Sequence, residues 1–120
     1  MYVESFKQLT VWQRAIEVIK EIYQVTARLP VAEQYGLIGQ MRRAAVSIPA
    51  NIAEGKKRKT KRDFRSFLRT ADGSAAELET LIIVAGQVYP TIDFSRCSSP
   101  LTEVQKMLTA MIQKLEASKS

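Results

Sequence analysis

The sequence predicts an all-α protein, folded as an antiparallel up-down bundle of four helices. Apolar residues recur at steps of three and four in four segments, and no segment alternates apolar and polar residues as a half-buried strand does. The connections between these segments are mostly short, which favours neighbouring helices that run in opposite directions. The chain has 120 residues, enough for one domain over residues 1–120, with 1–8 as a lead and 117–120 as a fraying tail.

The first helix is expected from Thr10 to the residue before Pro30. Thr10 and Gln13 have the spacing of a capping box, and proline disfavours helical backbone in the residue before it. The expected inner face comprises Trp12, Ala15, Ile16, Ile19, Ile22, Tyr23 and Thr26. Further apolar residues lie off this face, namely Val11, Val18 and Val25. This surplus predicts a second contact surface and therefore an oligomer.

The second helix is expected over 34–55, with Gly55 as its C-terminal cap. Its inner face comprises Leu37, Ile38, Met41, Ala45, Ile48 and Ile52. Pro49 removes the backbone hydrogen bond to the carbonyl of Ala45, which predicts a kink. A turn at Lys57 and Arg58 would then place small residues of the second and third helices opposite each other, Ala44 and Ala45 facing Thr70 and Ala71.

The third helix is expected to start at Thr60, with Asp63 in its first turn, and to end at Pro90. Its apolar stripe comprises Phe64, Phe67, Leu68, Ala71, Ala75, Leu78, Leu81, Ile82, Ala85 and Val88. A loop over 91–98 holds Cys97, and Ser99 followed by Pro100 is typical of a helix start. The fourth helix carries Leu101, Val104, Met107, Leu108, Met111 and Leu115.

Composition excludes several kinds of chemistry. The chain has no histidine and one cysteine, which excludes an internal disulfide, a conventional zinc site and any mechanism with an imidazole base. The longest apolar stretch, 81–85, is too short to span a membrane, and the start of the chain lacks the pattern of a signal peptide. We therefore expect a cytoplasmic protein with no metal, no cofactor and no enzymatic activity.

The positive charge is concentrated in one part of the chain. Lysine and arginine number 18 against 12 acids, and the basic run, residues 56–62, holds six cations and no acid. The wider basic zone, residues 42–69, holds ten cations against Glu54 and Asp63. The rest of the chain is slightly acidic. Such an uneven distribution favours a polyanionic partner.

Residues spread over the first three predicted helices carry a resemblance to a known family. They are Leu9 to Gln13, Tyr35 to Leu37, Gln40, Arg42 to Ala45, Ser47 to Gly55 (SIPANIAEG), Phe64, Phe67, Leu68, Gly73, Ser74 and Glu77 to Glu79. This pattern resembles the four-helix-bundle proteins encoded in intervening sequences of bacterial 23S ribosomal RNA genes. That family is similar to the accessory protein of diversity-generating retroelements, which assists a reverse transcriptase and binds nucleic acid. The resemblance implies a ring-like homo-oligomer, a pentamer, that binds nucleic acid.

The candidate nucleic-acid-binding residues are the ten cations of the basic zone: Arg42, Arg43, Lys56, Lys57, Arg58, Lys59, Lys61, Arg62, Arg65 and Arg69. We expect contacts to the phosphate backbone, of RNA more than DNA, with little base readout, because Phe64 and Phe67 belong to the apolar stripe. Glu77 and Glu79 point in different directions on a helix and so cannot form a catalytic pair.

Interpretations in which these cations bind no nucleic acid stay open. The basic run can be a solvated loop, and Arg42 and Arg43 can pair with Asp72 and Glu77 of the third helix. Two other function classes also fit the sequence. One is an interaction scaffold or accessory subunit of a reverse transcriptase, and the other is a structural oligomer without a nucleic-acid ligand.

Overall fold

The structure, a computed structural model, describes residues 5–118 and is built from helices. The four α-helices are α1 (Thr10–Thr26), α2 (Gly39–Lys56), α3 (Lys61–Val88) and α4 (Ser95–Ser118). Short 3-10 turns cover Phe6–Gln8 and Val31–Glu33, and a π-helical segment covers Gln34–Ile38. Residues 5–118 contain no strand, so the all-α prediction with four helices is confirmed.

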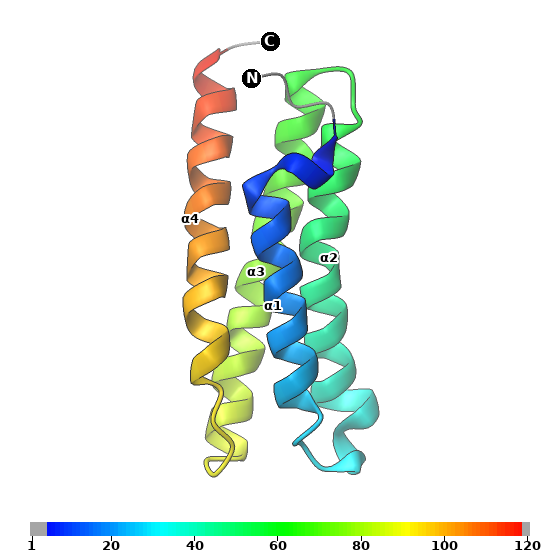
Figure 1. The fold of residues 1–120 in the computed structure, drawn as a ribbon, viewed down its shortest axis with the longest axis vertical. Coiled ribbons are helices and arrows are strands. Elements are labelled where there is room, and N and C mark those ends of the chain that lie inside the picture. Colours follow the sequence, from blue (N-terminus) through cyan, green and yellow to red (C-terminus); the bar gives the residue numbers. More distant parts are fainter. Residues whose placement is uncertain (1–4, 119–120) are drawn as a thin grey trace.

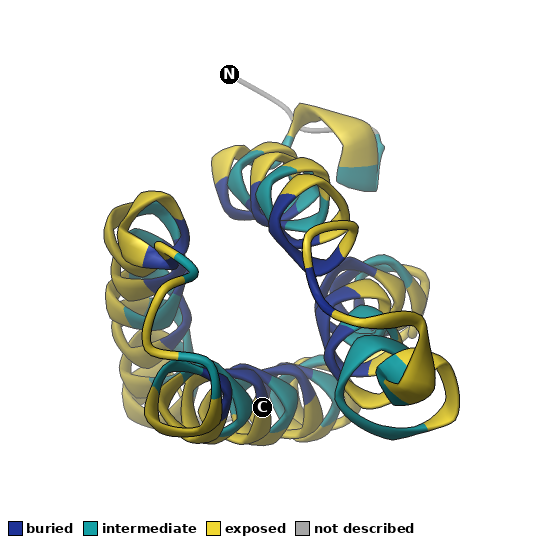
Figure 2. Ribbon diagram, turned by 90° about the horizontal axis from the view of Figure 1, so that it is seen from below, coloured by how far each residue is buried: buried dark blue, intermediate teal, exposed yellow. Residues whose placement is uncertain are grey.

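The helices pack side by side in an elongated body of 47 × 23 × 22 Å. α1 contacts α2 and α4, and α3 contacts the same two helices, so each helix has two neighbours. Seen end-on, the buried residues of all four helices face the middle (Figure 2). One end of the body gathers the start of α1, the α2–α3 connection and the end of α4 (Figure 1). Within residues 5–118, no helix has the length and apolar character needed to cross a membrane.

The inner face of α1 differs from the predicted one. The buried residues are Val11, Ala15, Val18, Ile22, Val25 and Thr26. The three valines predicted to form a second surface are therefore core, whereas Trp12 is half-buried and Tyr23 is 43% exposed. Both faces have helical spacing, and the contacts of α1 with α2 and α4 bury the face that carries the valines. The valines give no evidence of an oligomer.

The start of α1 also differs from the predicted capping box. Leu9 is the N-cap, with no side-chain cap hydrogen bond. The capping box lies one turn earlier, where Ser5 and Gln8 close the 3-10 turn. Gln13 instead donates from its side-chain amide to the carbonyl of Lys7 at 2.9 Å. This bond ties the 3-10 turn to the first turn of α1.

Two glycines of the second helical segment have roles that the sequence did not indicate. The non-helical backbone lies at Gly36 (φ −101°, ψ −114°), and the buried Pro49 lies inside α2, which continues through it as one helix. Gly55 is not a cap, because α2 continues to Lys56 and its C-cap is Lys57. Gly55 is buried against α3 instead: a Cβ atom at this position would lie 2.7 Å from the Cβ atom of Phe67.

The alignment of α2 with α3 is shifted from the predicted one. The predicted pairing of Ala44 with Ala71 would place Ser47 opposite Leu68, but the Ser47 hydroxyl lies 2.8 Å from the Ser74 hydroxyl. The chain reverses direction later than predicted because the connection extends to Thr60, the N-cap of α3. Small residues still meet across this contact.

The third and fourth helices are joined by a shorter connection than predicted. α3 ends at Val88, before Pro90, as predicted. α4 begins at Ser95, whose N–H donates to the Asp93 carboxylate at 2.9 Å. The predicted start at Ser99 and Pro100 is therefore wrong, and Cys97 is buried in the first turn of α4. α4 continues through residues 117 and 118, so these are helical; 119–120 and the first four residues of the predicted lead lie outside the described residues.

Candidate nucleic-acid interface

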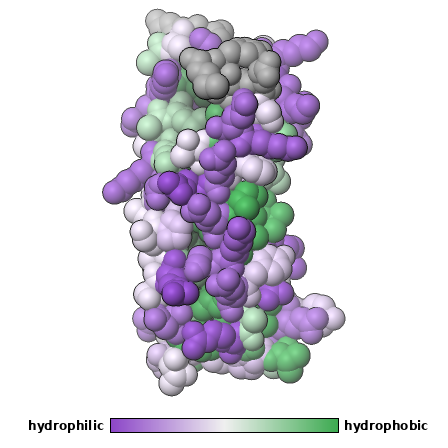
Figure 3. All heavy atoms as spheres, in the orientation of Figure 1, coloured by the Kyte–Doolittle hydropathy of each residue, from purple (hydrophilic) through white to green (hydrophobic). Residues whose placement is uncertain are grey.

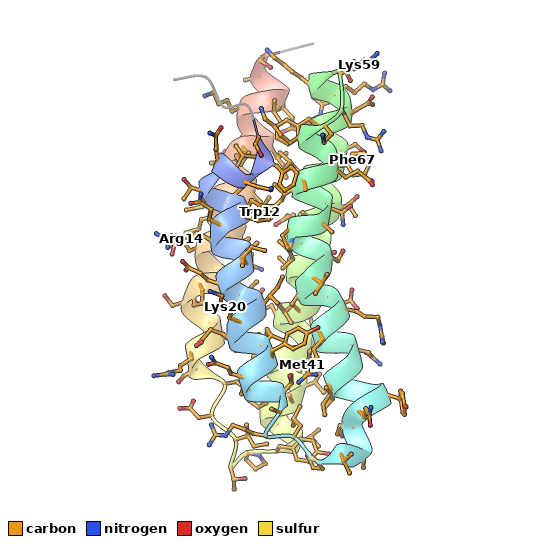
Figure 4. All side chains as sticks on the ribbon, turned by 45° about the vertical axis from the view of Figure 1, so that its right-hand side comes forward. Trp12, Arg14, Lys20, Met41, Lys59 and Phe67 are labelled. Carbon is orange, nitrogen blue, oxygen red and sulfur yellow. The ribbon has the colours of Figure 1, made fainter. Side chains whose placement is uncertain are left out.

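The basic run lies at one end of the bundle, where α2 passes into α3. The last turn of α2 closes with the N–H of Lys57 donating to the carbonyl of Glu54 at 3.2 Å. The side-chain oxygen of Thr60 accepts from the N–H of Asp63 at 3.1 Å, which confirms the predicted start of α3. Hydrophilic side chains project beyond the bundle near this connection (Figure 3), and Lys59 lies at its tip (Figure 4).

Five cations of the basic run are exposed, and one of them, Arg58, forms an ion pair with Glu54. The other four, Lys57, Lys59, Lys61 and Arg62, form no ion pair with an acid within residues 5–118. Because long side chains with exposed charges can reach outward, these four groups can contact successive phosphates of a nucleic-acid backbone. Their mutual repulsion is relieved by such a polyanion.

Two other cations of the basic run lie over phenylalanine rings. The Nζ atom of Lys56 is 5.9 Å from the centroid of the Phe64 ring, and the Cζ atom of Arg58 is 4.8 Å from that of Phe67. Both rings are half-buried. The prediction that the apolar stripe accounts for both phenylalanines therefore missed these contacts.

Arg65 and Arg69 follow the basic run on α3, and each differs from the four unpaired cations of that run. Arg65 is half-buried, and its Nε atom has no hydrogen-bond partner among the residues that the structure describes. Arg69 forms an ion pair with Glu116 of α4. Because Glu116 offsets its charge, Arg69 contributes less positive potential than the four unpaired cations.

Arg42 and Arg43 are not brought to the connection. They lie about 20 Å from Lys56 along α2, given a rise of about 1.5 Å per residue. Arg42 donates from Nε to the hydroxyl of Thr26 at 3.0 Å, and its Cζ atom lies 4.3 Å from the centroid of the Tyr23 ring. Arg42 thus joins α2 to α1, whereas the alternative interpretation paired it with acids of α3. Arg43 is exposed.

Several acidic groups and the cysteine thiol lie outside the basic zone. Glu79 accepts a hydrogen bond from Gln105 at 3.0 Å, while Glu77 is exposed. Burial raises the pKa of the Cys97 thiol to about 11, with Glu21 and Asp93 adding to the effect. Residues 5–118 contain no group of three His, Cys, Asp or Glu side chains that could hold a metal ion.

Two further groups near the opposite end have shifted pKa values. A hydrogen bond to the Glu33 carboxylate, 2.5 Å away, raises the pKa of the Tyr89 hydroxyl. Hydrogen bonds from Ser95, first of all from its backbone N–H, lower the pKa of Asp93. Glu33 also accepts from the N–H of Leu37, and Ser95 starts α4, so these contacts fix helix ends.

The chain has counterparts among known proteins. The model of the 23S rRNA-intervening sequence protein family matches residues 7–110. The chain belongs to this family. As a 23S rRNA-intervening sequence protein, it carries the whole basic zone inside the matched segment.

A crystal structure from Bacteroides thetaiotaomicron is similar to this intervening sequence protein. It is described as a protein of unknown function from the S23 ribosomal protein family, with 25% sequence identity and a TM-score of 0.76. The alignment covers 86% of this chain and 98% of the other. The comparison with curated proteins found no match.

Proposed function

We propose that this chain is a non-enzymatic RNA-binding protein, an antiparallel bundle that assembles into a ring-like homo-oligomer. The observation that carries the proposal is the group of exposed cations at the α2–α3 connection, Lys57, Lys59, Lys61 and Arg62, which pair with no acid of the described chain. The chain without its basic run has equal numbers of cations and acids, so the run supplies the net charge of +6. Solubility alone gives no reason for this concentration.

The expected ligand is a structured RNA bound through its phosphates. The family is named after sequences that interrupt 23S ribosomal RNA, which favours RNA over DNA as the partner. Each phosphate contact releases condensed counterions, so the affinity should fall steeply as salt is added, by a log–log slope of about −0.7 to −0.9 per contact.

Exposed apolar side chains support the proposed oligomer. Ile83, Val84 and Val88 of α3 are 58%, 42% and 55% exposed, and Tyr35 at the start of the second helical segment is 88% exposed. The proposed number of five subunits comes from the family resemblance. A ring would repeat the basic run in every subunit and raise the avidity for a long RNA. Light scattering tests this proposal, because a mass of 13.5 kDa would contradict it.

Two triple variants with equal charge changes test the RNA-binding proposal. The first changes Lys57, Lys59 and Arg62 to glutamine, and the second changes Lys20, Arg43 and Lys106. All six residues are exposed, so neither variant removes core contacts. We expect the first variant to lose most of its affinity for a structured RNA and the second to bind almost as the wild type does. Equal losses in the two variants would contradict a localised site.

The alternative function is an accessory subunit that binds a reverse transcriptase. In that case the exposed apolar residues of α3 would contact the enzyme, and the basic run would contact its RNA. Co-purification distinguishes the two functions, because an RNA-binding oligomer retains RNA without the enzyme.

A further inference from the structure

Arg58 differs from its neighbours in the basic run because its side chain contacts both an acid and an aromatic ring. Its backbone N–H donates to the carbonyl of Gly55 at 3.0 Å. Its guanidinium NH2 atom lies 3.6 Å from the Oε2 atom of Glu54, and its Cζ atom lies 4.8 Å from the centroid of the Phe67 ring. The side chain is nevertheless 46% exposed. Arg58 is therefore both restrained and accessible.

The ring that supports Arg58 is held by the close contact between α2 and α3. Gly55 has no side chain, and the Cβ atom of Phe67 occupies the space where a side chain at position 55 would begin. Phe67 therefore cannot move closer to α2, and Figure 4 shows it on α3 near the end of the bundle that carries Lys59. The half-buried ring provides a fixed base for the guanidinium.

We propose that Arg58 and Phe67 form a stacking platform for an unpaired base of a single-stranded RNA segment. A guanidinium is planar and can stack on an aromatic ring through one face while its other face receives a base. Unstacked bases in loops, bulges and single strands bind to such planes, whereas the bases of a duplex are already stacked on their neighbours. The platform therefore selects RNA with unpaired bases.

This inference rests on the proposed function, and it assigns different RNA contacts to different residues of the basic run. The exposed cations Lys57, Lys59, Lys61 and Arg62 would hold the phosphates, which duplex and single strand share. Arg58 would add a contact that only a base can make. Its ion pair with Glu54 offsets part of its charge and keeps the guanidinium in place, which suits stacking better than phosphate binding.

The test compares wild type with Arg58→Lys and Phe67→Leu on three RNAs of equal length: a single strand, a duplex and an abasic single strand. Arg58→Lys keeps the positive charge and replaces the planar guanidinium by an ammonium group. Because the Arg58 side chain is partly exposed, this change leaves folding intact. We expect it to weaken single-strand binding by roughly 5- to 160-fold, the range of one lost base stack, while binding of duplex and abasic RNA stays unchanged. Phe67→Leu should show the same pattern.

Each outcome bears on the platform in a defined way. If Arg58→Lys binds the single strand as tightly as wild type does, or weakens all three RNAs equally, the platform is wrong and phosphate binding by the basic run still stands. If wild type binds none of the three RNAs, the proposed function is wrong and the platform falls with it. Because Phe67→Leu alters a packed residue, a loss seen only in that variant counts against the platform.

Discussion

Gly55→Ala should destabilise the protein even though alanine is the better helix former. The new Cβ atom would lie 2.7 Å from the Cβ atom of Phe67 and 3.0 Å from a ring carbon of Phe64. Real Cβ atoms do not approach other atoms that closely, and the Phe67 Cβ cannot rotate away because it is attached to the backbone. Ordinary contact therefore requires α2 and α3 to separate by about 0.7 Å at this point.

The magnitude follows from two opposing effects. Overpacking of a buried site costs about 1–3 kcal/mol, and replacing a helical glycine by alanine returns up to about 1 kcal/mol. The expected net loss in the free energy of unfolding is therefore up to about 2 kcal/mol. Gly73→Ala is the matched control, because a Cβ atom at position 73 of α3 meets no atom within 4 Å. This control should gain about 0.5–1 kcal/mol.

Urea denaturation followed by circular dichroism measures both variants. The prediction is that the midpoint falls for Gly55→Ala and rises for Gly73→Ala, with little change in the slope m. Equal shifts in the two variants would refute the close contact of α2 and α3 at Gly55. That result would also remove the fixed base on which Arg58 rests.

Three further predictions concern the core, Arg42 and Cys97. Val18→Ala should lower the free energy of unfolding by about 2 kcal/mol, because Val18 is fully buried and its loss leaves a cavity. A neutral effect in urea denaturation would show that Val18 lies outside the core, as the sequence predicted. Arg42→Gln should lower the free energy of unfolding by about 1 kcal/mol, because the contacts with Thr26 and Tyr23 are lost. Its RNA affinity in a titration should stay unchanged, and a loss of affinity would show that Arg42 belongs to the binding site. The pKa of Cys97 is about 11 in the folded chain against 9.0 ordinarily, so the thiol favours folding below pH 9 and this contribution is lost as the pH rises toward 11. Between pH 9 and 11 the wild type should therefore lose more stability than Cys97→Ala, and parallel pH profiles would contradict the burial of the thiol.

Features governed by local chemistry could be predicted from the sequence. The start of α3 depends on the hydroxyl of Thr60 and the N–H of Asp63, which are three residues apart in the chain. The end of α3 depends on Pro90, whose ring disfavours helical backbone in the residue before it. The charge of the basic run is likewise a property of consecutive residues.

Features that depend on a neighbouring helix could not be predicted. Whether Val18 or Trp12 faces the core depends on which helices flank α1, since both positions have helical spacing. The contact of Ser47 with Ser74 depends on where the chain reverses direction, and Gly55 is typical of a cap until the position of α3 is known. The same close contact brings Phe67 beneath Arg58, so no sequence signal indicated that pair.

The salt dependence of RNA binding tests the central claim most directly. The measurement is the affinity of a structured RNA at several salt concentrations, for wild type and for the variant with glutamine at Lys57, Lys59 and Arg62. Binding through the exposed cations predicts a steep negative log–log slope for wild type, and a slope shallower by about 2–3 for the variant, which lacks three phosphate contacts. Identical slopes for the two proteins, or wild-type binding that does not depend on salt, would contradict the account.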